Sequence, residues 1–242
     1  MAQDIKSWAK EAKKVDERLD RDPIDHEYFF RDPGRPMFVE DDLIFSPADG
    51  VLIYQTVVED MKKPIDAKGA MVTLPQLMGD PDFNQPCLVM AVFMTAYDVH
   101  INRMPTAGLV RYRLLDPIGT RNFPMLETEK GLLSGVLDKS ASDYTRQNER
   151  MINRIYAPFL DYTYYLVQLA DEDVDIIQPF SVRQNKWYFQ TERFSFIRWG
   201  SQVNIVLPLS HHMIFTTMQK TMTHVNAGQD VLVKITDFER DA

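Results

Sequence analysis

The spacing of hydrophobic residues predicts a helix at the start of the chain. In residues 4–20 the apolar positions recur at steps of three and four, with lysines and arginine on the other faces. These apolar positions are Ile5, Trp8, Ala12, Val15 and Leu19. In one interpretation this helix docks on the body of the protein. In the other it lies in a membrane interface, with Trp8 at headgroup depth and lysines around it.

From residue 43 onward, short apolar runs alternate with glycine, proline and aspartate, which predicts β-strands. The predicted strands are 43–45, 50–58, 70–74, 87–94, 108–115, 162–170, 187–190, 194–199, 202–208 and 230–235. Between them, residues 138–156 predict a helix, with Asp138 or Ser140 as its cap. This order lacks regular βαβ alternation, so we expect an α+β fold with a mainly antiparallel sheet or sandwich core and a few peripheral helices. No linker or repeat interrupts it, and residues 1–242 are expected to form a single domain.

Composition narrows the class of protein. Of the 242 residues, 45% are apolar and 26% are charged, which is ordinary for a globular chain and excludes collagen, coiled coil and disorder. The 27 basic and 35 acidic residues give a net charge of −8. That charge argues against a nucleic-acid partner and against binding anionic lipid by bulk charge.

Cysteine content and hydropathy indicate the compartment. The single cysteine, Cys87, excludes an intramolecular disulfide and a cysteine-rich zinc site. No run of 18 apolar residues occurs, and the first residues lack the apolar core of a signal peptide. We therefore expect a cytoplasmic protein, either soluble or peripheral on the inner face of a membrane.

Most common catalytic motifs are absent from the sequence, including glycine-rich phosphate loops, GxSxG and HExxH. His211 and His212 are adjacent, and adjacent residues of a strand point to opposite faces, so no metal site is expected there. The segment SPADG (46–50) forms a turn, because Pro47 fixes φ and Asp49-Gly50 is a favoured turn pair. Functionally, Asp49 would be a carboxylate held at a strand end, able to orient a histidine.

Two further segments carry candidate chemistry. TAYDVHINRMP (95–105) follows an apolar strand and contains His100, which is either a structural histidine or a group for proton transfer near neutral pH. In FSFIRWGSQVNIVLP (194–208) two predicted strands abut at Gly200-Ser201 without turn chemistry. Glycine inside a strand marks a bulge or close approach. Here it would let the Ser201 hydroxyl reach the carbonyl of Gly200.

Together these segments resemble the phosphatidylserine decarboxylase family of pyruvoyl enzymes, in its short, single-histidine form. The similarity covers about four-fifths of the chain, in the same order as the family's motifs. The matching segments are YFFRDPGRP (28–36), SPADG, FMTAYDVHINRMP (93–105), QNERMI (147–152), GSQV (200–203) and the tail VNAGQDVLVKI (225–235).

The resemblance implies a role for each matching residue. Ser201 attacks the carbonyl of Gly200, the chain is cut into residues 1–200 and 201–242, and Ser201 becomes a pyruvoyl group. Asp49 and a histidine activate Ser201, since a serine hydroxyl is a poor nucleophile without a base. The pyruvoyl carbonyl forms a Schiff base with the substrate amine and accepts the electrons left after CO2 departs. His100 then protonates the substrate carbon, and Asp98 joins it in binding the substrate.

The sequence departs from the family pattern in four places. Arg103 stands where longer bacterial members have a second histidine, so either His100 serves both steps or processing is impaired. Asp171 replaces a glycine, and Gln202 replaces the usual threonine or arginine after the serine. The long hydrophobic N-terminal extension of many members is missing.

These departures keep three functions open. The leading one is conversion of phosphatidylserine to phosphatidylethanolamine by a homodimer that contacts the membrane through residues 1–20 and loops near Met104 or Phe123. A second is decarboxylation of a free amino acid. The third is an uncleaved, non-catalytic relative that acts as a binding or scaffold protein.

Overall fold

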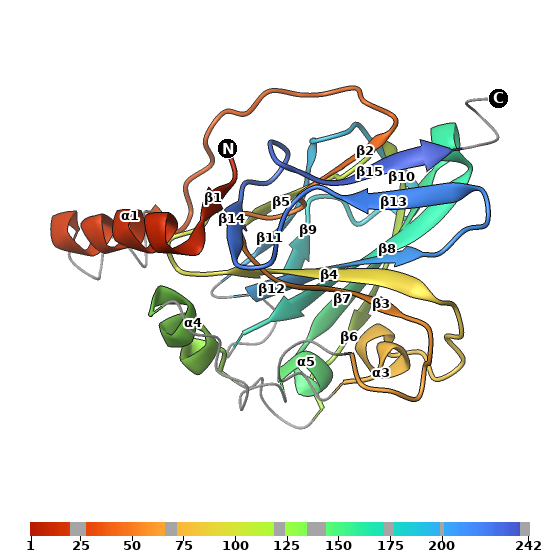
Figure 1. Cartoon of the computed structure of the whole chain (residues 1–242), viewed down its shortest axis with the longest axis horizontal. Helices are drawn as coiled ribbons and strands as arrows, with labels where there is room; N and C mark the ends of the chain where they lie inside the picture. The colour runs from red at the N-terminus through yellow and green to blue at the C-terminus, as the bar shows by residue number, and fades with distance from the viewer. Residues whose placement is uncertain are drawn as a thin grey trace.

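Antiparallel strands dominate the computed structural model, which confirms the predicted α+β class (Figure 1). It describes residues 1–19, 28–65, 72–118, 124–134, 144–171, 177–198 and 201–237. Strands within these ranges form one nine-stranded sheet and two three-stranded sheets.

The large sheet carries the site described below. Its strands, in spatial order, are β1 (Gln3–Asp4), β14 (Thr223–Val225), β3 (Gly50–Val58), β4 (Cys87–Met94), β12 (Ser201–Pro208), β8 (Tyr162–Ala170), β7 (Arg150–Ala157), β6 (Gly108–Leu115) and β10 (Lys186–Tyr188). Every pairing in it is antiparallel. The central strands β4 and β12 are covered on both faces, and β4 is therefore apolar throughout rather than alternating, whereas β12 also buries Ser201, Gln202 and Asn204.

The two faces of the large sheet have different partners. The small sheets β5 (Ile101–Arg103)–β11 (Arg193–Ile197)–β9 (Ile177–Pro179) and β13 (Met213–Thr217)–β15 (Val231–Asp237)–β2 (Leu43–Phe45) share one apolar core with one face. Four helices share a second core with the other face: α1 (Ile5–Arg18), α3 (Leu74–Met78), α4 (Leu126–Leu133) and α5 (Tyr144–Gln147). A short 3-10 helix, η2 (Pro158–Leu160), connects β7 to β8.

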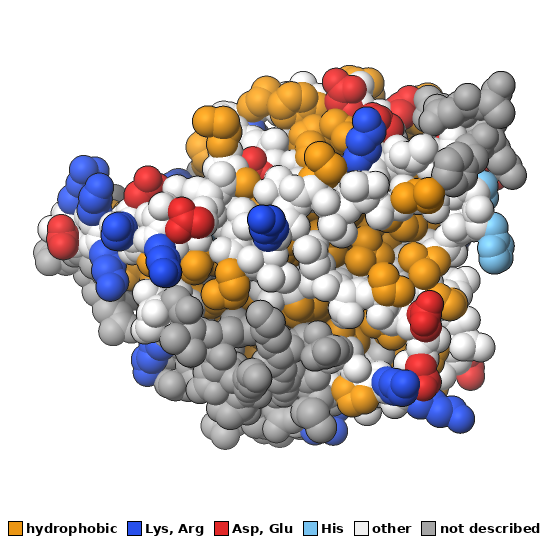
Figure 2. Space-filling view, viewed as in Figure 1, with side chains coloured by type: hydrophobic (Ala, Val, Ile, Leu, Met, Phe, Trp, Pro, Cys, Tyr) orange, Lys and Arg blue, Asp and Glu red, His pale blue; other side chains and the backbone are white. Residues whose placement is uncertain are grey.

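Helix α1 matches the docked interpretation of the N-terminal segment. Asp4 caps it by accepting hydrogen bonds from the backbone amides of Lys6 and Ser7. Trp8 is only 5% exposed and stacks on His224 at 5.1 Å between ring centroids, so it is not available to a lipid headgroup. The basic side chains lie on the exposed face, and Figure 2 shows them gathered over this helix. Among the described residues, no helix is both long and apolar enough to span a bilayer.

Two of the predicted elements are wrong. One of them is the predicted helix 138–156. Its residues 138–143, which hold both proposed caps, lie outside the described residues. In the rest, only Tyr144–Gln147 is helical, and Arg150–Ala157 is the strand β7. Met151, Ile155 and Ala157 face one core while Ile152 faces the other, a two-residue period that suits a covered strand. Of the predicted strand 70–74, residues 70 and 71 lie outside the described residues. Thr73 forms only an isolated bridge with Pro64 and caps helix α3, accepting a hydrogen bond from the amide of Gln76, and Leu74 begins the helix.

Candidate active site

Ser201 begins the central strand β12 and is fully buried. Its neighbours across the sheet are Met94, the last residue of β4, and Ala170, the last residue of β8. The hydroxyl donates a hydrogen bond to the sulfur of Met94 at 3.1 Å. A thioether is a weak acceptor, and among the described residues this hydroxyl has no carboxylate or carbonyl partner. Gly200, the other half of the expected cleavage position, lies outside the described residues.

His100 lies in the loop that leaves β4, and its ring is fully buried. Its Nδ1–H donates to the backbone carbonyl of Asp98 at 2.9 Å, which leaves the lone pair on Nε2. Within the described part of the chain, Nε2 has no hydrogen-bond partner. Phe29 stacks on the ring at 3.8 Å between centroids, and the amide of Ile197 donates to the His100 carbonyl.

The electrostatic surroundings keep His100 uncharged. Burial lowers the pKa of the imidazole to about 4, outweighing the hydrogen bond and charge of Asp98, and the charge of Arg31 lowers it further. At neutral pH the ring therefore offers a free, uncharged Nε2, the form that can accept a proton.

Asp98 holds the loop that carries His100. One carboxylate oxygen accepts hydrogen bonds from the amide and hydroxyl of Thr95, at 2.8 and 2.9 Å. The other accepts from Nε2 of His224 at 2.6 Å. Burial alone would raise the pKa of Asp98, but the charge and hydrogen bond of His224, with the Thr95 bonds, leave it below its ordinary value. Asp98 is thus an ionised group with both oxygens engaged by the protein.

Asp49 ends the SPADG turn and forms a buried ion pair. Its two oxygens accept from Nη1 and Nη2 of Arg35, at 2.5 and 2.6 Å, and one of them also accepts from the amide of Ala227 at 2.7 Å. Among the described residues these are its partners, and His100 is not one of them. Gly50 follows with φ of +148°, and a Cβ there would lie 2.1 Å from the carbonyl oxygen of Phe93, so glycine is required.

Arg103, which replaces the second histidine of the longer family members, is buried beside this pair. Its Nη1 donates to the carbonyl of Thr191 at 3.0 Å, and Nη2 lies 3.5 Å from a carboxylate oxygen of Asp32. Asp32 also pairs with Arg193 at 2.9 Å. Three arginines and two aspartates therefore link residues 28–36 to the SPADG turn and to β5 and β11.

Residues 148–150, the sequence NER within the QNERMI segment, contact β8, the strand on the other side of Ser201 from β4. The Asn148 side chain donates to the carbonyl of Ala170 at 2.8 Å, and the amide of Ala170 donates to the Glu149 carbonyl. Asp171, next in the chain, accepts from the amide of Met125 just before α4. Gln202 faces the helices and accepts from the Tyr144 hydroxyl at 2.9 Å.

The register of the sheet brings the predicted residues to one end of it. Ser201 pairs with Met94, Val51 pairs with Phe93, and the loop after β4 carries Asp98 and His100. Sequence reasoning did not single out four residues that contact this group: Phe29, Arg35, Met94 and His224. Three of them stand within motif segments quoted above, whereas His224 is in a three-residue strand with no motif signal of its own.

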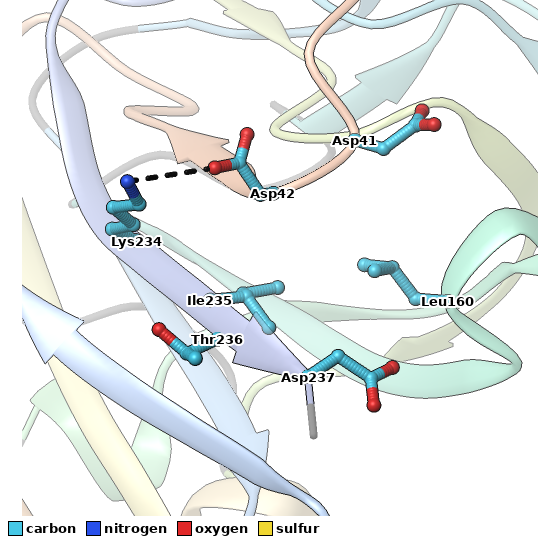
Figure 3. Close-up of a pocket in the computed structure, with 7 residues that line it drawn as sticks. All are labelled: Asp41, Asp42, Leu160, Lys234, Ile235, Thr236 and Asp237. Atoms are coloured by element: carbon cyan, nitrogen blue, oxygen red, sulfur yellow. Dashed lines mark ion pairs between the residues drawn. The ribbon is translucent and has the colours of Figure 1, made fainter. Parts of the chain in front are cut away.

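Other features of the described residues lie apart from this group. No cluster of three potential metal ligands occurs in them, and His212 contacts the Ser210 hydroxyl at 2.9 Å. Met104 is fully buried, so its side chain does not face a membrane, and Phe123 is outside the described residues. A surface pocket of about 480 Å³ is lined by Asp41 and Asp42 just before β2, by Leu160 of η2 and by Lys234–Asp237 of β15 (Figure 3). None of its lining residues was expected to take part in the chemistry.

Comparison with known proteins identifies the family. A family model described as phosphatidylserine decarboxylase matches residues 27–233. The phosphatidylserine decarboxylase proenzyme of Erythrobacter litoralis is 29% identical over 208 residues, which cover 86% of this chain and 72% of that protein. The one from Xanthobacter autotrophicus is 30% identical over 205 residues, 84% of this chain and 71% of that protein. A third, from Ehrlichia chaffeensis, is 29% identical over 210 residues, 87% of this chain and 75% of that protein. The chain belongs to the phosphatidylserine decarboxylase family, whose members are carboxy-lyases.

Proposed function

We propose that this chain is a precursor that cuts itself between Gly200 and Ser201 and then converts phosphatidylserine to phosphatidylethanolamine. One observation carries the proposal. Ser201 is buried at the first position of the central strand, and His100, whose Nε2 has no partner among the described residues, lies at the same end of the sheet. A single domain of residues 1–242 would thus become an upstream chain, 1–200, and a downstream chain, 201–242.

In the first step His100 acts as the base. The Ser201 oxygen forms a bond to the Gly200 carbonyl carbon while the carbon–nitrogen bond breaks. Nε2 of His100 takes the hydroxyl proton and returns it to the departing nitrogen, which leaves an ester between Gly200 and the Ser201 oxygen. The imidazole is uncharged at neutral pH, so its Nε2 lone pair can accept this proton. Loss of the Ser201 α-proton then breaks the bond between Cβ and the ester oxygen, so that Gly200 leaves as a carboxylate and the chain is cut. In the resulting dehydroalanine, water replaces the nitrogen, which departs as ammonia and leaves the pyruvoyl group.

The residues present fit a pyruvoyl group made from Ser201. Its position is fully buried between β4 and β8, the surroundings exclude water, and the only described partner of the hydroxyl is the Met94 sulfur. When formed, the group supplies an electron sink for the carbanion left by loss of CO2. Nε2 of His100 then accepts the proton that the substrate ammonium loses as it reacts, and delivers that proton to the substrate carbon.

The two aspartates act by positioning. Asp98 fixes the loop of His100 through Thr95 and His224, and with His100 it borders the place of the substrate head group. Asp49 assists Ser201 indirectly, because its pair with Arg35 anchors residues 28–36 and so holds Phe29 against His100.

The proposed phospholipid substrate is supported by the family, and the proposed membrane contact is supported by the charges on the surface of α1. A phospholipid substrate agrees with the family, and the exposed basic face of α1 gives an otherwise acidic chain a place to contact anionic lipid. We propose a homodimer that binds peripherally to the inner face of the membrane.

The experiment is the intact mass of freshly synthesised protein, followed by assays with phosphatidylserine vesicles, free serine and free aromatic amino acids. The expected result is two chains with a blocked downstream amino terminus, and CO2 release from the vesicles. Ser201→Ala should stay full length and inactive, while Ser210→Ala, which replaces a half-buried serine beyond the other end of β12, should cleave normally. Cleavage of Ser201→Ala would refute the role of the hydroxyl. If the protein decarboxylated a free amino acid and not phosphatidylserine, the substrate would be an amino acid and not a phospholipid.

Arg103 favours a second candidate, an uncleaved binding protein. A guanidinium cannot act as a proton acceptor, and this one is bound to Thr191 and Asp32. If the wild-type chain remains whole and carbonyl reagents modify nothing, this second function replaces the first.

A further inference from the structure

The sulfur of Met94 is the described acceptor for the Ser201 hydroxyl. The two residues are directly opposite in the β4–β12 register, and both are fully buried. The hydroxyl oxygen lies 3.1 Å from the sulfur. Because cross-strand neighbours on one face are the closest side-chain pairs in an antiparallel sheet, this contact follows from the register itself.

A buried polar network fixes the sulfur in place. Nδ2 of Asn102 lies 3.7 Å from the sulfur, and the side-chain oxygen Oδ1 of Asn102 accepts a hydrogen bond from Nε2 of Gln168 at 2.5 Å. The same Nε2 donates to the Ser195 hydroxyl at 2.7 Å, and Gln168 accepts from Asn153 at 2.8 Å. These four polar residues are at most 1% exposed. A fully buried, satisfied network of this kind holds its members in one arrangement.

We propose that Met94 is a positioning residue for self-cleavage, and that its sulfur aims the Ser201 hydroxyl before the attack on Gly200. The inference rests on the self-cleavage proposed above. The sulfur takes no proton. It accepts the hydroxyl hydrogen weakly, which fixes the rotamer and leaves the hydrogen free to move to His100.

The same strand offers a matched control. Met90 lies four residues earlier on β4, on the same face, with the same complete burial. Its partner across the sheet is Ile205, which has no hydroxyl to orient. Replacing Met90 therefore tests packing alone.

Two substitutions at position 94 separate hydrogen bonding from packing. Met94→Leu keeps an apolar side chain of similar size but removes the acceptor. Met94→Gln keeps the length and supplies a stronger acceptor at the cost of burying an amide. If Met94 only fills space, leucine should be tolerated better than glutamine. If it orients the hydroxyl, the order is reversed.

The measurement is the rate of cleavage after a pulse of cell-free synthesis, followed by intact mass, with thermal unfolding of each purified variant. We expect Met94→Leu to slow cleavage roughly tenfold, the effect of losing about one hydrogen bond. Met94→Gln should cleave faster than Met94→Leu, and Met90→Leu should match the wild type. Met94→Ile provides a second apolar variant should leucine disturb folding.

The outcomes are distinguishable. Suppose that the wild type cleaves. If Met94→Leu and Met94→Ile then cleave at the same rate as the wild type, or if Met94→Gln cleaves more slowly than Met94→Leu, the role of Met94 is refuted and the proposed function stands. A wild-type chain that never cleaves overturns the proposed function and this inference with it.

Discussion

Removing one member of the buried Arg35–Asp49 pair should destabilise the protein strongly. Both side chains are 5% exposed, and the contact is bidentate. In Arg35→Met the aspartate keeps only the amide of Ala227, and the Ala227 carbonyl loses the hydrogen bond it accepted from Arg35. A carboxylate left unpaired in the interior costs about 3–5 kcal/mol.

An exposed pair supplies the comparison. Nζ of Lys234 lies 3.8 Å from a carboxylate oxygen of Asp42, and these side chains are 53% and 51% exposed (Figure 3). Solvent screens such a pair, so Lys234→Met should cost less than about 1 kcal/mol. The double variant Arg35→Met/Asp49→Leu should recover part of the loss, because no charge is then left unpaired.

The assay is thermal unfolding in a Ser201→Ala background, where every chain stays whole. For a protein of this size, about 4 kcal/mol lowers the melting temperature by roughly 8–16 °C. A loss in Arg35→Met no larger than that in Lys234→Met would refute the assignment of Asp49 to this ion pair. It would return Asp49 to the role expected from sequence, that of orienting a histidine.

Three further predictions concern neighbouring residues. The pKa of His100 is lowered to about 4, so as the pH falls from about 6.5 the unfolded chain binds this proton before the folded chain does. The free energy of unfolding should therefore drop by up to roughly 3 kcal/mol between pH 6.5 and pH 4. His100→Gln should remove this contribution to the pH dependence of stability. His224→Phe, which leaves Asp98 without its imidazole donor, should slow decarboxylation more than His224→Gln, which still donates; equal rates would contradict the positioning role. Gly50→Ala should lower the melting temperature sharply because its Cβ meets backbone, whereas Gly34→Ala, with open space around it, should not.

Hydrophobic patterning predicted the sheet where strands are long. The apolar runs at 87–94 and 162–170 coincide with β4 and β8, because strands covered on both faces need continuous apolar sequence. It failed at β7, where the polar residues Arg150, Asn153 and Arg154 interrupt the pattern and favoured a helix. Those side chains are accommodated by partners distant in sequence, such as Gln168 for Asn153, and a local pattern cannot show them.

The sequence indicated which residues form the candidate site, but not which of them are hydrogen-bonded to one another. Motifs indicated Ser201, His100, Asp49 and Asp98, but the partner of Asp98 is 126 positions away in a three-residue strand. Tertiary structure alone brings such groups together. The closeness of Asp98 and His100 in sequence therefore does not show which histidine the Asp98 carboxylate contacts.

Two histidines near this end of the sheet have a ring nitrogen without a partner among the described residues, and the fold distinguishes them. Nδ1 of His224 is unpartnered as well as Nε2 of His100. Along β14, however, Val225 belongs to the core under the small sheets, so His224 points to the opposite, helix side, where Trp8 covers it. Ser201 has the same parity as Val203 and Ile205, which face the small sheets. Since His100 is bonded through its carbonyl to β11 of a small sheet, it shares the side of Ser201. Because Arg103 cannot accept a proton, we propose that both proton transfers use His100. His100→Ala should then abolish cleavage as well as decarboxylation, and a His100→Ala chain that cleaves at the wild-type rate would show that another group is the base.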